Sequence, residues 1–266
     1  MIRERLSAAE RKYRVDYQVR IMIRIRKTMI LLAFLVVLCT AVPTLAAMRQ
    51  GSGSGTNAGA ESGAVLKGTY DAATLAPSGV TVLFVVAANG EEKNASGDFY
   101  AYVKTENGWE EKMAAVPAKL GRGGIGKEIE GDQKTPLGTF LMNTPFGIKG
   151  SEEGFPSNYK KVTAANYWSG EHNGTYNKFC DTGKDGQYTG ASEHLIDYAG
   201  YYDYAINTGY NPGCEIGKGS ALFLHCAVNG QNTGGCIAIP ASDMKKALTY
   251  YRDGKTAIVI RRKGDF

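Results

Sequence analysis

Short alternations of apolar and polar residues run through much of the chain, and they predict strands rather than long helices. Residues 80–88 form a continuous apolar run, as expected for a buried strand. Residues 98–105 alternate like a half-buried strand, and Glu106-Asn107-Gly108 is a hairpin signal that returns the chain along residues 109–116. We expect further short strands at residues 192–197, 202–209, 221–228 and 256–262.

One helix is predicted near the C-terminal end, from about Ser242 to Arg252. Ser242 can cap its first turn, and Gly254 ends it. Four residues fall at the i, i+3, i+4 and i+7 spacing of a buried helical face: Met244, Ala247, Leu248 and Tyr251.

Glycine, proline and polar residues mark the loops. Residues 121–126 form a glycine loop, and Pro136 and Gly138 fit a type I turn that begins at Thr135. Residues 143–190 are polar and rich in turn residues, and a loop this long in a compact domain is usually functional. We therefore expect residues 143–190 to supply a lid or a substrate wall.

The N-terminal part of the chain has a different pattern. Residues 28–47 carry no charge and follow a basic flank, which indicates a signal peptide or an N-terminal membrane anchor. Small residues at Ala46 and Ala47 favour cleavage, and a start at Met22 would give a leader of more ordinary length. Either way we expect the rest of the chain to be exported.

Three segments follow from these patterns. Residues 1–47 form a basic segment and a hydrophobic leader. Residues 48–78 form a linker and an entry segment, because residues 48–66 are rich in Gly, Ser and Ala. Residues 79–266 form the folded domain.

Composition supports a mainly β fold, and the distribution of charge shows that the positive net charge is confined to the N-terminal segment. The 34 glycines and 16 tyrosines favour short strands joined by turns, so we expect a mainly β domain with few short helices. The net charge of +5 comes from residues 1–27, which hold nine Lys or Arg and three acidic residues. The remaining 22 basic and 23 acidic residues nearly cancel, so we expect no nucleic-acid binding.

The cysteines differ in their surroundings. An exported chain meets oxidising conditions, so Cys180 and Cys214, both in turn-rich loops, either form a disulfide or stay free. Strand alternation puts Cys226 on one face with Leu222 and Leu224, which favours a core thiol. Cys236 follows two glycines and precedes an apolar run.

Cys236 and His225 form the pattern of a thiol nucleophile and its base. A thiol nucleophile needs a base for its proton and N–H groups that hold the oxyanion. His225 lies eleven residues before Cys236, and Gly234 and Gly235 let the backbone turn sharply, so that the Gly235 and Cys236 amides can face a substrate. An adjacent imidazolium can lower the pKa of a cysteine well below its free value of about 8.5. Acyl transfer would then need no metal and no cofactor.

Two alternatives stand beside this hypothesis: a buried structural thiol at Cys236 and a structural histidine at His225. The base also needs a partner on its second nitrogen, and the main-chain carbonyl of Cys226 is our candidate. Glu193 and His194 are either a cleft pair or a surface pair.

Patterns for other chemistries are weak. The chain has no CxxC motif, and its three histidines lack paired zinc-ligand spacing. Residues 121–126 lack the Lys-Ser/Thr of a phosphate loop.

Three separated motifs resemble the YkuD-type L,D-transpeptidases and occur in that family's order. The resemblance covers about residues 80–261. The motifs are Glu130-Gly-Asp-Gln-Lys-Thr-Pro-Leu-Gly-Thr-Phe140, Ser192-Glu-His-Leu195, and Leu224-His225-Cys226 followed by Thr233-Gly-Gly-Cys-Ile-Ala-Ile-Pro240.

The resemblance implies a mainly β, sandwich-like catalytic domain that acts on bacterial peptidoglycan outside the membrane. Cys236 would attack the carbonyl between residues three and four of a tetrapeptide stem and release D-Ala. An amine from a second stem would then resolve the thioester into a 3→3 cross-link. Carbapenems commonly acylate the cysteines of such enzymes.

The resemblance also assigns residues. His225 matches the base, Cys226 the residue whose carbonyl orients it, and Gly235 would supply an oxyanion amide. The expected substrate contacts are Thr233, Gly234, His194 and Trp168.

The chain departs from the commonest motif of the family, in which Ser-His-Gly-Cys precedes a polar residue. Thr233 and Gly234 stand at the Ser and His positions, and Ile237 follows the cysteine. We therefore place the sequence in a divergent Thr-x-Gly-Cys branch. A peptidoglycan L,D-carboxypeptidase with the same site, and a non-catalytic cell-wall-binding module, remain alternatives.

Overall fold

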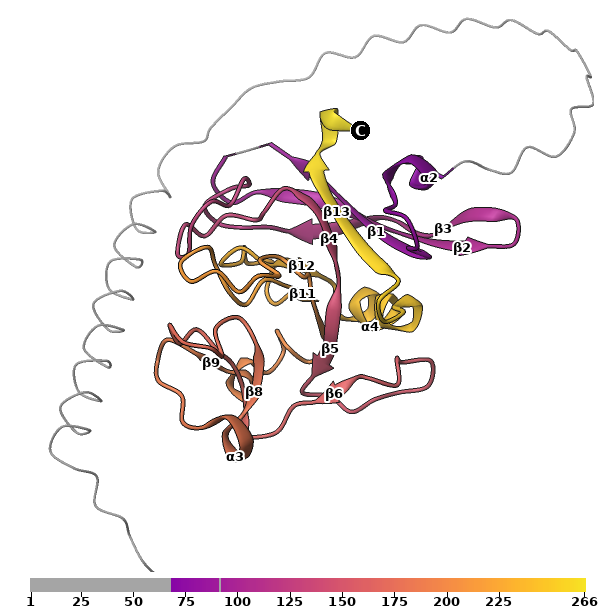
Figure 1. Cartoon of the computed structure of the whole chain (residues 1–266). Coiled ribbons are helices and arrows are strands. Elements are labelled where there is room, and N and C mark those ends of the chain that lie inside the picture. The colour runs from indigo at the N-terminus through magenta and orange to yellow at the C-terminus, as the bar shows by residue number, and fades with distance from the viewer. Residues whose placement is uncertain (1–67, 91) are drawn as a thin grey trace, which may run out of the picture. The chain divides into compact units, whose positions relative to one another are not determined.

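The computed structural model describes residues 68–90 and 92–266 (Figure 1). The predicted leader and most of the predicted linker lie outside these residues. Thirteen strands and a few short helices make the described part mainly β, as the sequence predicts. No helix in the described residues is both long enough and apolar enough to cross a membrane.

The elements are short and are joined by many turns. The helical segments are α2 (Ala72–Leu75), α3 (Thr182–Asp185), η1 (Leu195–Tyr198), α4 (Ala241–Tyr250) and η2 (Lys263–Asp265). The strands are β1 (Val82–Asn89), β2 (Ser96–Thr105), β3 (Gly108–Lys119), β4 (Gly138–Leu141), β5 (Asn143–Gly147), β6 (Lys160–Lys161), β7 (Asn166–Trp168), β8 (Phe179–Asp181), β9 (Glu193–His194), β10 (Ala205–Asn207), β11 (Phe223–Cys226), β12 (Ile237–Ile239) and β13 (Thr256–Arg262).

Ten strands form one sheet in the order β4-β13-β1-β2-β3-β12-β11-β10-β5-β6. Only Met142 separates β4 from β5, yet β4 pairs with β13 and β5 pairs with β10 in the other half of the sheet. The two strands run on from one another along one side of the domain (Figure 1). The sheet is therefore curled, and the β4–β5 connection joins its two halves.

The main core lies inside this curl. Side chains from β1, β2 and β13 meet others from β10, β11 and β12, and the predicted face of α4 packs among them. The i, i+3, i+4 and i+7 spacing is confirmed, because Met244, Ala247, Leu248 and Tyr251 are all fully buried. Cys226 is fully buried in the same cluster, as the strand alternation predicts.

A second sheet, in the order β8-β7-β9, covers another face of the curled sheet. Phe146 of β5 and Phe223 of β11 contact Trp168 of β7 with ring centroids 6.0 and 4.7 Å apart. Leu195, Tyr202 and Cys236 belong to the same cluster. The second sheet thus supports the strand that precedes the His225–Cys236 loop.

Several local predictions are wrong in detail. Thr135 and Gly138 form no type I turn, because Thr135 bridges Ile125 and Gly138 begins β4. Ser242 does not cap α4, which follows Pro240 and has no side-chain cap, and α4 ends at Tyr250, before Gly254. In each case a tertiary contact or a neighbouring residue sets where the strand or helix begins or ends, and this point differs from the one that local propensity predicts.

Candidate active site

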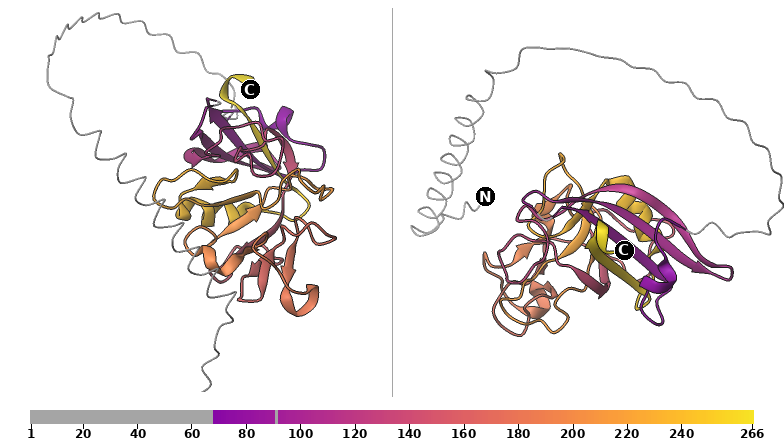
Figure 2. Two further views of the ribbon diagram at one scale, coloured as in Figure 1. Left: turned by 90° about the vertical axis from the view of Figure 1, so that its left-hand side faces the viewer. Right: turned by 90° about the horizontal axis from the view of Figure 1, so that it is seen from above.

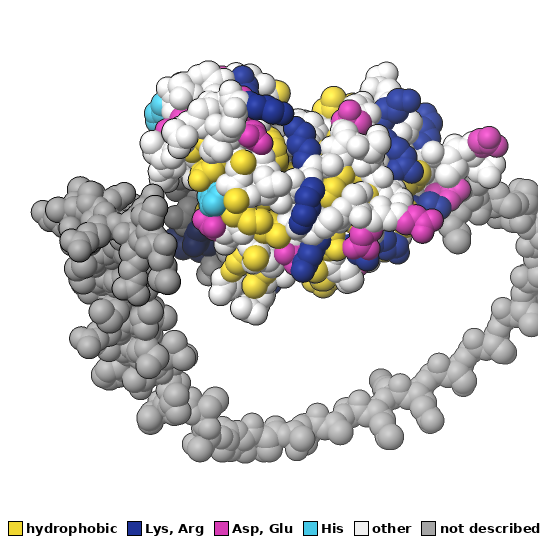
Figure 3. All heavy atoms as spheres, turned by 90° about the horizontal axis from the view of Figure 1, so that it is seen from below, with side chains coloured by type: hydrophobic (Ala, Val, Ile, Leu, Met, Phe, Trp, Pro, Cys, Tyr) yellow, Lys and Arg dark blue, Asp and Glu magenta, His cyan; other side chains and the backbone are white. Residues whose placement is uncertain are grey.

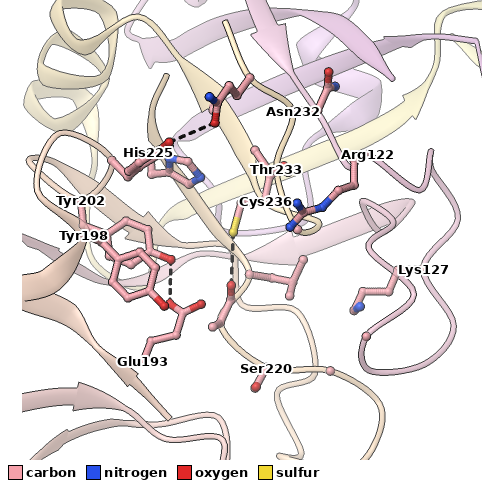
Figure 4. Close-up of a pocket in the computed structure, with 18 of the residues that line it drawn as sticks. Arg122, Lys127, Glu193, Tyr198, Tyr202, Ser220, His225, Asn232, Thr233 and Cys236 are labelled. Atoms are coloured by element: carbon pink, nitrogen blue, oxygen red, sulfur yellow. Dashed lines mark hydrogen bonds between the residues drawn. The ribbon is translucent and has the colours of Figure 1, made fainter. Parts of the chain in front are cut away.

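A cavity of about 470 Å³ opens beside the loop that joins β11 to β12 (Figure 4). Both Cys236 and His225 line it. Its other walls come from the glycine loop near Arg122, from the segment Gly219–Leu222, and from the tyrosines after β9. None of residues 143–190 lines it, so the expectation that this segment forms a substrate wall does not hold for this cavity.

Parallel strand pairing brings Cys236 and His225 onto one face. In β11 and β12, Leu224 lies opposite Ile237 and His225 opposite Ala238. Cys236, one residue before β12, therefore lies beside Phe223, whose N–H points at the Cys236 Sγ at 3.3 Å. Side chains two residues apart on a strand point the same way, so His225 lies on the side of the sheet that Phe223 and Cys236 share.

The Cys236 thiol is held between two main-chain groups. Its Sγ–H donates to the Ala221 carbonyl oxygen at 3.2 Å, and the Phe223 N–H reaches the sulfur. Only 7% of the residue is exposed. Burial, together with the nearby Glu193 charge, raises the pKa of Cys236 to about 12, so the resting sulfur is a thiol.

His225 is held in one tautomer. Its Nδ1 lies 2.9 Å from the Cys226 carbonyl oxygen, the contact expected from the sequence. A carbonyl only accepts, so Nδ1 carries the proton and Nε2 is left as the basic nitrogen. Burial lowers the pKa of His225 to about 4, so the imidazole is neutral at physiological pH.

The resting pair is therefore thiol and imidazole, and the expectation of a thiolate stabilised by an imidazolium does not fit it. Taking either charge out of water is costly, and both groups are buried. Any attack by the Cys236 sulfur would then have to be accompanied by loss of its proton, and His225 is the neutral base in the same cavity.

Thr233 and Gly235 shape the turn before Cys236. Thr233 Oγ1 donates to the Cys236 carbonyl at 2.6 Å and accepts the Gly235 N–H at 3.1 Å. Asn232 Nδ2 fastens the loop to the Ala95 and Leu120 carbonyls at 2.6 and 3.0 Å. The Gly235 amide is thus occupied by Thr233, which leaves the Cys236 amide as the better oxyanion donor of the pair expected from the sequence.

Replacing Gly235 with Ala should destabilise this turn, whereas the same change at Gly234 should not. Gly235 has a φ of +135°, and a Cβ there would lie 2.8 Å from the Lys134 carbonyl oxygen. At Gly234 the nearest atom to an added Cβ is Arg122 Nη2, at 3.7 Å. Strained backbone costs about 1–3 kcal/mol, so urea unfolding should show a loss of that size for Gly235→Ala. The Gly234→Ala variant should stay within about 0.5 kcal/mol of wild type, and equal losses would contradict this view of the turn.

Comparison with known proteins decides the family. The model of the YkuD family, described as the L,D-transpeptidase catalytic domain, matches residues 94–260. The chain belongs to the YkuD family. No curated protein and no solved structure matches it.

Membership of the YkuD family places the chain among the acyltransferases that act on peptidoglycan stem peptides. The match spans the glycine loop, the β9 region and the β11–β12 loop, and so contains all the walls of the cavity. Two of the expected contact residues of this L,D-transpeptidase domain, Thr233 and Gly234, line the cavity with Cys236.

The other two expected contact residues lie elsewhere. Both ring nitrogens of His194 are engaged outside the cavity, by Asp197 Oδ2 at 3.0 Å and the Ala164 carbonyl at 2.8 Å. Of the adjacent pair, only Glu193 faces the cavity, because neighbouring strand residues point to opposite sides.

Trp168 is a supporting residue behind the cavity. It is 2% exposed, and its Nε1–H donates to Asn177 Oδ1 at 3.0 Å. The same oxygen accepts the N–H of Ala221, the residue whose carbonyl holds the Cys236 thiol. Trp168 is thus linked to the Cys236 thiol through Asn177 and Ala221, without lining the cavity.

Several cavity residues gave no sequence signal of their own. Arg122 stands in a loop whose pattern is defined by its glycines, and tyrosines are typical of strands. The cavity residues of this kind are Arg122, Lys127, Tyr198, Tyr201 and Tyr202. The abundance of Tyr in the sequence is a weak signal for the three tyrosines, and no pattern in the sequence points to Arg122 or Lys127.

The cysteines of the YkuD domain are unpaired. Cys180 and Cys214 are free, so the disulfide considered between them does not form.

No three His, Cys, Asp or Glu side chains among residues 68–90 and 92–266 are grouped to hold a metal ion. Basic and acidic side chains are interspersed on the face in Figure 3, in keeping with the near-zero charge of this part of the chain.

Proposed function

We propose that this protein is a peptidoglycan L,D-transpeptidase that forms 3→3 cross-links through a thioester on Cys236. The observation that carries the proposal is the shared cavity of Cys236 and His225, with the His225 Nδ1 held by the Cys226 carbonyl. That contact leaves His225 Nε2 as the basic nitrogen of a side chain that lines the same cavity as the thiol. Cys226 itself does not line the cavity, and its Sγ donates to the Tyr204 carbonyl at 3.5 Å, so it is no rival nucleophile.

In the acylation step, the Cys236 sulfur attacks the carbonyl of stem residue three. The thiol proton passes to His225 Nε2, and the Cys236 amide stabilises the oxyanion. The C–N bond to D-Ala then breaks, and His225 returns the proton to the leaving nitrogen. The products are the thioester and free D-Ala, and His225 is neutral again.

In the second step, the amine of another stem attacks the thioester. The new C–N bond forms as the C–S bond breaks, and His225 relays a proton from the amine to the sulfur. Water in place of the amine would give a tripeptide, which is the carboxypeptidase reaction.

The proposal includes an exported location. Peptidoglycan lies outside the cytoplasmic membrane, and the uncharged residues 28–47 behind a basic flank support export. The partners are stem peptides, together with the membrane if the leader is retained. Neither a cofactor nor a nucleic acid has a part in the proposed reaction.

The products of wild-type protein test the proposal. Purified full-length protein would be incubated with disaccharide-tetrapeptides, and the products analysed by mass spectrometry. We expect free D-Ala and dimers whose fragmentation shows a 3→3 bond. Tripeptide without dimers would indicate a carboxypeptidase, and unchanged substrate would favour a wall-binding module.

A further inference from the structure

The cavity beside Cys236 is lined by the cations of Arg122 and Lys127 and by the carboxyl groups of Glu130 and Glu193 (Figure 4). Arg122 and Lys127 lie on one side of the cysteine, and Glu193 lies on the other with Tyr198 and Tyr202. Lys127 is already neutralised, because its Nζ lies 2.9 Å from Asp132 Oδ1. Within residues 68–90 and 92–266, no Lys, Arg or His side chain forms an ion pair with the carboxyl group of Glu193.

Glu193 is fixed on its wall. It belongs to β9 and pairs with Trp168 of β7, which anchors its backbone to the second sheet. Its Oε2 accepts the Tyr202 hydroxyl at 2.7 Å. Tyr198 stacks on Tyr202 with ring centroids 4.9 Å apart. A carboxylate beside aromatic rings is a suitable environment for an ammonium group.

We propose that Glu193 binds the ammonium group of the acceptor stem and takes a proton from it before that amine attacks the Cys236 thioester. This inference rests on the proposed function, since it names the acceptor group of the second step. The ammonium loses one proton to the Glu193 carboxylate, and the free amine forms the C–N bond. Glu193 then returns its proton to solvent as the dimer leaves.

The surroundings of Glu193 suit this role. The groups that face it are the Tyr202 and Tyr198 hydroxyls and the Cys236 thiol, with His225, Glu130, Arg122 and Lys127 around the same cavity. Burial raises the pKa of Glu193 to about 7, against the opposing effect of the Tyr202 hydrogen bond. A carboxyl group that ionises near neutrality can both attract an ammonium and accept its proton.

The partition of the acyl-enzyme between amine and water tests the inference. Full-length wild type and Glu193→Gln would be given disaccharide-tetrapeptides with lysine or diaminopimelate at position three. We expect Glu193→Gln to lower the ratio of dimer to tripeptide at least about tenfold. The wild-type ratio should rise with pH through about 7, and the variant should lack this rise.

Two controls separate this role from a structural one. Glu130→Gln makes the same change in the same cavity, but Glu130 has different partners from Glu193, since its Oε1 accepts the Ser220 hydroxyl at 2.9 Å and its Oε2 lies 3.7 Å from His172 Nε2. The ratio should therefore fall far less than in Glu193→Gln. Tyr202→Phe removes the hydrogen bond and keeps the carboxyl, so dimers should persist. Acylation of Cys236 by a carbapenem, which needs no acceptor, should not fall in Glu193→Gln, because loss of the Glu193 charge would only ease ionisation of the thiol.

Two results would overturn the inference. An unchanged dimer-to-tripeptide ratio in Glu193→Gln would remove the acceptor role, and an equal fall in carbapenem acylation would show that Glu193 serves the nucleophile instead. If wild type makes tripeptide but never dimers, the transpeptidase proposal itself fails and takes the acceptor role with it. The assignment of Cys236 would survive that outcome.

Discussion

The Cys236→Ala variant is expected to lose all measurable turnover of tetrapeptide stems while it stays folded. The thiol lines the cavity and is the group that would form the thioester, so its removal leaves no nucleophile. The fold should tolerate the change, because the side chain is small and lines the cavity. Release of D-Ala, followed by mass spectrometry, measures the loss, and circular dichroism checks the fold.

A second cysteine provides the control for this variant. Cys180 is also buried, but it lies in β8 and its Sγ donates to the Lys178 carbonyl, away from the cavity. Cys180→Ala should therefore turn over stems at the wild-type rate. Near-wild-type turnover by Cys236→Ala would reject the nucleophile assignment, whatever Cys180→Ala does.

The His225→Ala variant is expected to slow acylation of Cys236 by about 10²–10⁴-fold, the usual contribution of a positioned base. The thiol has a pKa near 12 in its buried setting, so without a base it has almost no thiolate at neutral pH. Single-turnover release of D-Ala measures this step. His172→Ala is a matched control, because the His172 side chain is largely exposed and lies outside the cavity.

The pH dependence of acylation provides a further check on His225. Only the neutral imidazole can take the thiol proton, and burial lowers the pKa of His225 to about 4. Acylation by wild type should therefore lose its base only as the pH falls through about 4, rather than near the ordinary value of about 6.5. A fall centred near 6.5 would show that His225 is solvated and that the thiol–imidazole description is wrong.

Local patterns were sufficient for several of the strands and for one helix face, but they missed β5, β6, β7 and β8, which lie in the segment 143–190 that the turn residues predict as a loop. The β1–β2–β3 meander and β13 are found where alternation and hairpin signals place them, and α4 buries its predicted stripe. These features depend on neighbouring residues and on side-chain periodicity, which a sequence carries directly. The curl of the sheet depends on β4 and β5 pairing with distant strands, and no local pattern specifies those partners.

The residues of the candidate site also fall into those that a local motif predicts and those that only the pairing of distant strands brings to the cavity. His225, Cys226 and Cys236 lie in one short stretch, so their motif could be read as a unit. Glu193 faces the cavity while its neighbour His194 faces away, and only the register of β9 on β7 decides which of the two does so. Trp168 was expected at the substrate, but its size and aromatic partners put it in the apolar layer behind.

The mass of the intact protein after exposure to a carbapenem tests the central claim most directly. Our account predicts that full-length wild type gains the mass of one opened carbapenem, and that the added mass maps to Cys236. The Cys236→Ala protein should gain nothing under the same conditions. A folded wild-type protein that never gains this mass, or an adduct that persists in Cys236→Ala, would contradict the assignment of Cys236 as the nucleophile.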